Sequence, residues 1–184
     1  MLKKDLYDLL QNSQIDPYKL SSFQKILLIA DGTLTNILEA FLNESIGVIK
    51  LSEKIVSITT DMILLEIKTG TEVLERQILL QGKTSQRNWL YADSIIVLER
   101  IEAQFRKELI KSHSPIGKLW AEHKTETFKE IVTYAREPSG FLANYFDITR
   151  EDKLLSRTYR VFSGHKPVMM ITEKFPENSL GKVR

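Results

Sequence analysis

Two segments of the chain alternate between apolar and polar positions with the period of two that is typical of β-strands, and each carries a charge on its apolar face. One face of the first segment consists of Leu74, Arg76, Ile78 and Leu80. One face of the second consists of Met169, Ile171, Glu173 and Phe175. A charge that points inward is costly unless it is paired or bound to a ligand. Arg76 and Glu173 therefore predict a salt bridge or a pocket for a small polar ligand, and register alone slightly favours the salt bridge.

Apolar residues recur at helical spacing near the start of the chain and at strand spacing from residue 46 onward. Helices are predicted at residues 1–12, at 23–30 and from Thr33 or Asp31 to Leu42. Strands are predicted at residues 46–51, 62–68, 73–80, 89–98, 127–134, 156–162 and 168–175, and the last two form a hairpin across 163–167. A helix is predicted at 99–111 and a short one from Ser114-Pro115, whereas 141–146 is ambiguous. This order predicts the α+β class, with one mainly antiparallel sheet and helices on at least one face.

Composition narrows the class of protein without identifying a function. The 184 residues suffice for one domain with a full core, and the mixed charges, which sum to +2, form no basic cluster of the kind that binds nucleic acid. The absence of cysteine excludes disulfides and thiolate chemistry and is compatible with a reducing compartment. No apolar run approaches the ~20 residues of a membrane span, and the N-terminal segment lacks a signal-peptide core. We therefore expect a cytoplasmic protein, most simply a monomer, that binds neither nucleic acid nor membrane.

Motifs that carry chemistry on their own are absent from the sequence or weak in it. There is no glycine-rich phosphate loop and no Gly-x-Ser-x-Gly element. His123 and Glu126 have a spacing that could place both on one metal if they lie on a helix, but a single such unit favours surface roles. If residues 156–162 form a strand, Arg157 and Arg160 point to opposite faces. Anion binding and the solubility of an edge strand explain either arginine about equally well.

Five segments, taken in order, resemble the chorismate pyruvate-lyase family, especially its bacterial and archaeal branch formerly filed as a domain of unknown function. They are Asp31-Gly32-Thr33-Leu34-Thr35, Leu74-Glu75-Arg76, Pro115-Ile116-Gly117, Ser156 through Val161, and Lys166-Pro167 with Ile171 through Pro176. They imply a chorismate-lyase-like domain at residues 23–184 after a helical lead-in at 1–22. The resemblance further implies an antiparallel sheet of about six strands, flanked by helices around a buried site. It also implies elimination of pyruvate from chorismate to give 4-hydroxybenzoate, with no cofactor and no metal.

The resemblance assigns roles to residues of this chain. Arg76 matches the arginine that binds the ring carboxylate, and Glu173 matches the glutamate that meets the ring hydroxyl. Substrate-binding positions are implied at Leu34, Ile116, Arg157 and Arg160. The first two would act through their backbone N–H groups, and we hypothesise that one of the two arginines holds the enolpyruvyl carboxylate. On this interpretation Arg76 and Glu173 bind the two ends of a ligand and do not form a salt bridge with each other.

Three functions remain open on the sequence. The first is the lyase reaction, which would supply a precursor of a quinone or of a phenolic lipid. The alternative is a non-catalytic domain of the same fold that binds an aromatic carboxylate, as in bacterial transcription regulators. Those regulators carry a DNA-binding domain in front, and the 22 or so residues that precede the resemblance here are too few for one, so we expect an enzyme. In the third, Arg76 and Glu173 merely pair, and no ligand stabilises the protein.

Overall fold

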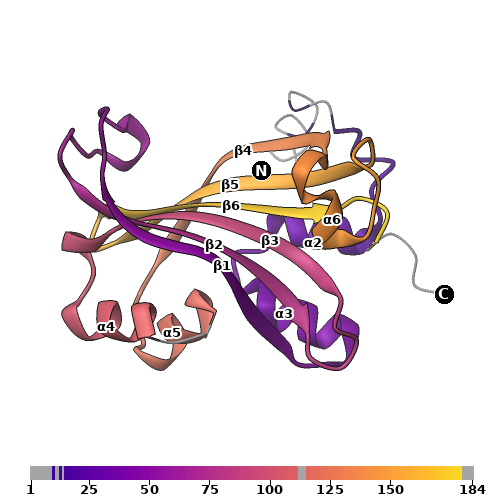
Figure 1. The fold of residues 1–184 in the computed structure, drawn as a ribbon, viewed down its shortest axis with the longest axis horizontal. Helices are drawn as coiled ribbons and strands as arrows, with labels where there is room; N and C mark the ends of the chain where they lie inside the picture. Colours follow the sequence, from indigo (N-terminus) through magenta and orange to yellow (C-terminus); the bar gives the residue numbers. More distant parts are fainter. Residues whose placement is uncertain (1–9, 11–12, 14, 112–114, 180–184) are drawn as a thin grey trace.

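The fold is a single six-stranded antiparallel sheet with helices packed against it (Figure 1). The computed structural model describes residues 10, 13, 15–111 and 115–179. The strands are β1 (Ile46–Ser57), β2 (Glu72–Gly82), β3 (Asn88–Val97), β4 (Phe128–Pro138), β5 (Lys153–Ser163) and β6 (Lys166–Pro176). They lie in the order β1-β2-β3-β6-β5-β4, so the final strand, β6, lies between β3 and β5, and β1 and β4 are the edge strands. The predicted α+β class with one antiparallel sheet is confirmed.

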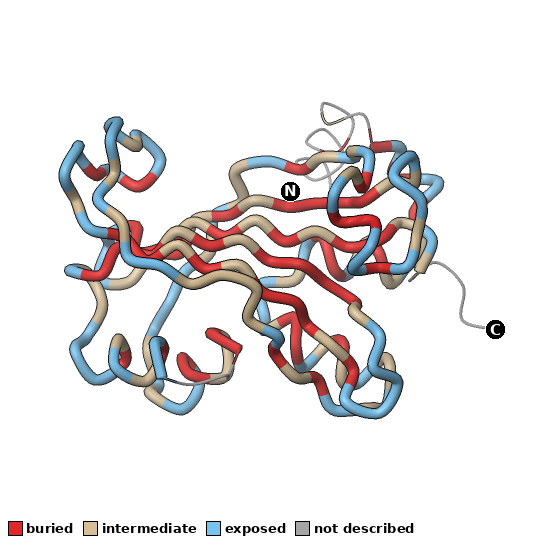
Figure 2. The backbone as a smooth tube through the Cα atoms, viewed as in Figure 1, coloured by how far each residue is buried: buried red, intermediate tan, exposed pale blue. Residues whose placement is uncertain are grey.

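Most of the helices cover one face of this sheet, which we call the inner face. The α-helices are α2 (Ser22–Ile29), α3 (Leu34–Leu42), α4 (Ala103–Lys111), α5 (Ile116–Glu122) and α6 (Ala143–Phe146). Buried residues of α2, α3, α4 and α5 share one core cluster with the inner-face residues of the sheet. The short α6 instead packs on the opposite face, where Phe146 joins Leu79, Tyr91 and Leu154. Figure 2 shows that burial follows the strands, while the connecting loops are mainly exposed.

The way α2 begins and ends determines where the chain continues into α3. Ser21 and Gln24 form a capping box, in which Ser21 Oγ accepts from the Gln24 N–H at 3.1 Å and the Gln24 side chain accepts from the Ser21 N–H at 2.7 Å. The helix ends before Ala30, whose backbone is extended. The chain then turns through Gly32 to Thr33, which is the N-cap of α3. This sharp break places the start of α3 over the inner face of the sheet.

The strand predicted at 62–68 is wrong, because the segment forms a 3₁₀ turn at Ile63–Leu65 with a single bridge from Met62 to Ile67. The Arg100 guanidinium donates to the carbonyls of Leu65 and Glu66 at 2.6 and 2.7 Å, so these groups need no neighbouring strand. The ambiguous segment at 141–146 is helical. Most of the helix predicted at residues 1–12, and Ser114 ahead of α5, lie outside the described residues.

Candidate active site

A cavity opens between the inner face of the sheet and the first turns of α3 and α5. The sheet contributes Ile78, Leu80, Leu90, Ala92, Ser94, Lys129, Tyr159, Ile171 and Glu173 to its lining. The helices and their lead-ins contribute Thr33, Leu34, Thr35, Pro115, Ile116, Gly117 and Trp120. A mostly apolar wall with a few polar groups is typical of sites for small organic ligands. The cavity volume is about 60 Å³, which is smaller than the roughly 300 Å³ at which ligand pockets begin, so an aromatic ligand needs more room than this structure shows.

Glu173 presents its carboxylate to this cavity, and both of its oxygens are held from behind. Its Oε2 accepts a hydrogen bond from Arg157 Nε at 2.7 Å, in a pair that faces directly across β5 and β6. Its Oε1 accepts from the Tyr159 hydroxyl at 3.0 Å. Charge-assisted hydrogen bonds of this length fix both position and orientation. The carboxylate is therefore oriented in advance for whatever enters the cavity.

Arg157 is almost fully buried and lies behind Glu173 rather than among the residues that line the cavity. Besides Glu173, it donates through Nη1 to the carbonyls of Leu28 and Ala30 at 3.3 and 2.8 Å. These carbonyls lie at the end of α2, where intrahelical partners are lacking and a cation is favourable. Burial acts to lower the pKa of Arg157, but the Glu173 carboxylate and Tyr159 outweigh it and raise that pKa. Arg157 therefore stays charged while it ties α2 to the sheet.

Tyr159 and Lys129 also face the cavity, and the sequence analysis identified neither. Complete burial and then the neighbouring Glu173 charge raise the pKa of Tyr159 well above its usual value, so its hydroxyl remains a donor. Lys129 Nζ lies 5.2 Å from the centre of the Tyr159 ring and donates to the Gly32 carbonyl at 3.1 Å. Burial, with a smaller contribution from the Arg157 charge, lowers the pKa of Lys129, although Glu173 opposes the shift. The sequence offered one indication for Tyr159, which is that it lies two residues after Arg157 and therefore on the same face of the strand.

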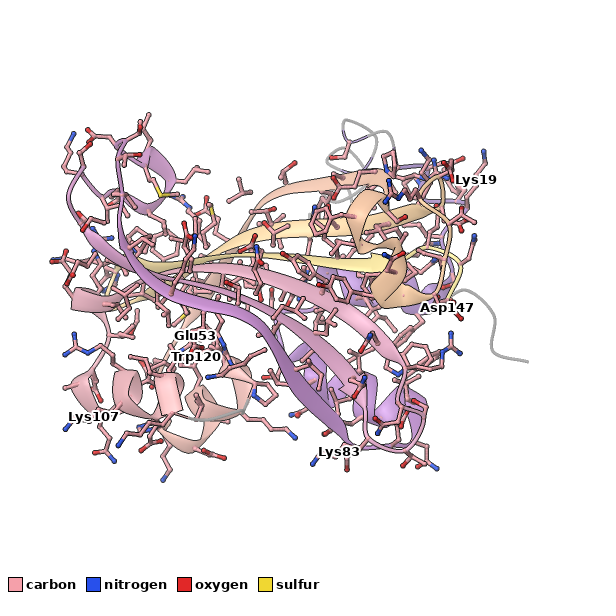
Figure 3. The ribbon with its side chains drawn as sticks, viewed as in Figure 1. Lys19, Glu53, Lys83, Lys107, Trp120 and Asp147 are labelled. Atoms are coloured by element: carbon pink, nitrogen blue, oxygen red, sulfur yellow. The ribbon has the colours of Figure 1, made fainter. Side chains whose placement is uncertain are left out.

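Arg76 occupies the same inner face, two strands away from Glu173. Its Cα pairs with those of Glu53 on β1 and Ser94 on β3, and its Nε lies 3.2 Å from Glu53 Oε2. Ser94 lines the cavity, whereas Arg76 itself is fully buried beyond it. Burial lowers the pKa of Arg76, and the Glu53 charge opposes this. Figure 3 labels Glu53 and also Trp120 of α5, among the side chains that surround the central strands.

The two inward charges predicted from register are therefore each paired, but with different partners. Arg76 pairs with Glu53, and Glu173 pairs with Arg157. Lys50 Nζ also reaches Glu53, at 2.9 Å, and donates to the Ile110 carbonyl at 3.1 Å. This chain of contacts connects the buried guanidinium to the end of α4. The salt bridge predicted between Arg76 and Glu173 is therefore wrong, because each charge has its own partner, and of these four side chains the cavity is lined by that of Glu173.

Leu34 and Ile116 are the first residues of α3 and α5, and both line the cavity. The first N–H groups of a helix have no intrahelical acceptor. The two helix starts approach each other closely, because a Cβ on Gly117 would stand 2.5 Å from Thr33 Cγ2. A glycine at this position allows both helix starts to reach the cavity.

Replacing Gly117 with Ala is expected to lower the free energy of unfolding by about 1–2 kcal/mol, since overpacking outweighs the better helix propensity of Ala. Thr33 makes no side-chain capping bond, so Thr33→Ala in the same chain should relieve the clash and restore stability. Gly32→Ala is the matched control, because nothing lies within 4 Å of its added Cβ. Urea unfolding measures all three. A Gly117→Ala protein as stable as the parent would contradict the close approach.

Arg160 lies on the other face of β5. Its Nη1 donates to the Leu64 carbonyl at 3.0 Å, and its Nη2 pairs with Glu130 at 2.7 Å. It therefore contacts the loop between β1 and β2 from the outer side of the sheet and helps to hold that loop in position. Of the two arginines predicted near the site, the structure brings Arg157 onto the face of Glu173 and places Arg160 away from the cavity.

The remaining motif does not form a metal site. His123 Nε2 lies 2.7 Å from Glu108 on α4, a residue other than the Glu126 of the spacing argument. Within the described part of the chain, no three side chains of His, Asp or Glu gather in a metal-binding arrangement. The helices of that same part are each too short or too polar to cross a lipid bilayer.

Known proteins resemble this chain in sequence along most of its length. A family model described as Chorismate pyruvate-lyase Rv2949c-like matches residues 28–184. The chorismate pyruvate-lyase of Mycobacterium leprae (strain TN) is 32% identical over 159 residues, which cover 85% of this chain and 75% of that protein. The chorismate pyruvate-lyase of Mycobacterium tuberculosis (strain ATCC 25618 / H37Rv) is 30% identical over 162 residues, which cover 85% of this chain and 81% of that protein.

Solved structures resemble the fold at much lower sequence identity. PhnF from Mycobacterium smegmatis superposes with a TM-score of 0.66 and 12% identity, over 83% of this chain and 67% of that one. The effector domain of PhnF superposes with a TM-score of 0.62 and 14% identity, over 80% of this chain and 90% of that domain. At these identities the likeness establishes the fold alone.

Proposed function

This chain belongs to the family of Rv2949c-like chorismate pyruvate-lyases, and on that premise we propose that it eliminates pyruvate from chorismate and leaves 4-hydroxybenzoate. The family membership confirms the resemblance carried by the five sequence segments. The observation that supports the activity most directly is Glu173, a carboxylate held by two hydrogen bonds at the wall of an otherwise mostly apolar cavity. A carboxylate in such a place can orient a hydroxyl or accept a proton.

We propose that the substrate lies with its ring between the apolar walls and its hydroxyl toward Glu173. The ring carboxylate would then lie at the other end, toward Ser94 and the buried charge of Arg76 behind it. The backbone N–H groups of Leu34 and Ile116 at the helix starts would add hydrogen bonds to that carboxylate. Arginine is suited to carboxylates in a dry site because its planar guanidinium offers two parallel donors.

The reaction needs little from the protein beyond positioning and charge stabilisation. The bond between ring carbon 3 and the ether oxygen breaks, and its electron pair leaves with the enolpyruvyl oxygen. The hydrogen on ring carbon 4 is lost as a proton, which makes the ring aromatic, and a proton is taken up at the methylene carbon to give pyruvate. Fixing the enolpyruvyl arm and stabilising charge on the ether oxygen are the contributions open to the site. Glu173 is our candidate for the group that accepts or directs the proton.

Arg157 receives a different role from the one hypothesised from the sequence. Its guanidinium binds Glu173 and the end of α2, and it does not line the cavity. We assign it as a positioning residue that orients the Glu173 carboxylate through the hydrogen bond from its Nε. Arg160, on the outer face of the sheet, is left out of the proposed site.

The test is to incubate the purified protein with chorismate, without added metal, and to identify the aromatic product while pyruvate is assayed. Equimolar 4-hydroxybenzoate and pyruvate above the spontaneous rate would support the proposal. Formation of 3-hydroxybenzoate would support the cavity as the reaction site but contradict the proposed position of the hydroxyl on the product. A folded protein that forms no product would overturn the lyase proposal altogether.

A binding domain without catalysis is the second candidate, because the effector domain of PhnF shares the fold. Both candidates predict that 4-hydroxybenzoate stabilises the protein, by about 2.7 kcal/mol at a hundred times the dissociation constant. A thermal shift with 4-hydroxybenzoate therefore tests the site, and turnover of chorismate separates the two functions. If 4-hydroxybenzoate does not raise the melting temperature, the ion pairs of Arg76 and Glu173 are more simply explained as purely structural.

A further inference from the structure

Lys129 enters the cavity from β4 beside Glu173, and neither the sequence motifs nor the family resemblance assigned it a role. Among the described residues that line the cavity, Lys129 is the one cation. Arg157 and Arg76 lie behind the wall, where carboxylates of the protein already pair with them. A positive charge brought to the surface of a mostly apolar cavity is costly unless an anion meets it there.

Lys129 has a hydrogen-bond acceptor but no ion pair among the described residues, while the Glu173 and Asp31 charges act on it from farther away and favour its charged form. Its Nζ donates to the Gly32 carbonyl at 3.1 Å, which uses one of the three donors of an ammonium group. None of the ion pairs among the described residues involves Lys129. Burial lowers its pKa, which means that the charged form lacks solvation that a ligand could replace. Its remaining donors suit an anionic group of a ligand.

The place of Lys129 in the site indicates which anionic group that is. Its ammonium stands against the Tyr159 ring at 5.2 Å, and the Tyr159 hydroxyl donates to Glu173. Lys129 therefore lies at the Glu173 end of the cavity, where the ring hydroxyl of the substrate is proposed to bind. In chorismate the enolpyruvyl ether is on the ring carbon next to the one that carries this hydroxyl. The carboxylate of that arm is the anion nearest to this end, and the ring carboxylate is at the far end.

We propose that Lys129 binds the enolpyruvyl carboxylate of the substrate and stabilises the negative charge that passes to the leaving pyruvate unit. The inference rests on the proposed function and adds that the two carboxylates of the substrate are bound by different residues. One end of the cavity binds the carboxylate that the product keeps, and Lys129 binds the carboxylate that leaves. Lys129 should then matter for chorismate, which carries both carboxylates, and hardly at all for 4-hydroxybenzoate, which carries one.

The experiment compares Lys129→Met, which keeps most of the length of the side chain without its charge, with the unaltered protein. For Lys129→Met we expect kcat/KM for chorismate to fall by about 10- to 100-fold, as for the loss of a charge-assisted hydrogen bond. The dissociation constant of 4-hydroxybenzoate should change by less than about threefold. Lys129→Arg, which retains a charge, should lose less activity than Lys129→Met. Lys54→Met, at an exposed lysine paired with Glu75 on β2, controls for the change in net charge and should match the parent.

Two outcomes would overturn the assignment while leaving the lyase proposal intact. Unchanged chorismate kinetics in Lys129→Met would show that the leaving carboxylate is bound elsewhere. An equal loss of affinity for chorismate and 4-hydroxybenzoate would place Lys129 at the ring carboxylate or in the packing of the site. Absence of turnover by the unaltered protein would instead overturn the proposed function, and this inference with it.

Discussion

Replacement of Glu173 with Gln is expected to reduce kcat for chorismate by about 10²- to 10⁴-fold, the usual contribution of a positioned proton-transfer group. Gln has nearly the same shape and can still accept the hydrogen bond that the Tyr159 hydroxyl now donates. What it lacks is the negative charge and the ability to take up a proton. In Glu173→Gln protein that is shown to be folded, the loss should appear in kcat more than in KM. Initial rates of pyruvate release, with the aromatic product identified, measure both constants.

A matched control separates this effect from a general loss of stability. Glu137 on β4 pairs with Lys174, the neighbour of Glu173 along β6, at 2.8 Å, and its side chain is 38% exposed. Glu137→Gln removes a carboxylate close in the sheet but outside the cavity, so its kinetics should match those of the parent. Glu173→Gln protein that is folded and retains kcat within tenfold of the parent would remove Glu173 from the proton-transfer role.

The strand register of β2 and β6 could be predicted from the sequence because both strands alternate regularly. Arg76 and Glu173 each fall on the buried face, as the period-two pattern predicted. The hairpin of β5 and β6, the helices α2, α3 and α4, and the antiparallel sheet were likewise predictable. In each of these elements the local pattern and the tertiary packing agree, so no long-range information was needed.

The partners of these charges could not be predicted, and β-bulges are one reason. In β1 the register shifts between Lys50 and Ser52, and in β4 it shifts between Ile131 and Thr133. A bulge inserts one residue and reverses which side chains point inward beyond it. Counting by twos from the buried Val48 would therefore place Glu53 outside, whereas the structure places it opposite Arg76.

Lys129 was missed for the same reason. Counting back by twos from the buried Tyr134 selects Glu130 as an inward residue, but the bulge between them brings Lys129 inward instead. Nothing in the local sequence marks this bulge. The site thus combines charges on regular strands, which the pattern revealed, with charges beyond bulges, which needed the structure.

Replacement of Arg157 with Met is expected to lower the free energy of unfolding by about 3–5 kcal/mol, the cost of leaving one partner of a buried ion pair alone. The change removes the bond to Glu173 and leaves the carbonyls of Leu28 and Ala30 at the end of α2 without their donor. Urea unfolding, with the slope checked for two-state behaviour, gives the free energy. Arg136→Met is the matched control, because Arg136 pairs with Glu177 while 40% exposed, and should cost no more than about 1 kcal/mol.

The double variant Arg157→Met with Glu173→Met tells whether the loss comes from the stranded carboxylate. Replacing both members of a buried pair with apolar residues of similar size is often close to neutral, so most of the stability should return. About 1–2 kcal/mol should stay missing, because the α2 carbonyls have still lost their charged donor. If the double variant is as unstable as Arg157→Met alone, the main role of the arginine is to hold α2 in place, and its proposed role in positioning the Glu173 carboxylate at the cavity wall loses its support.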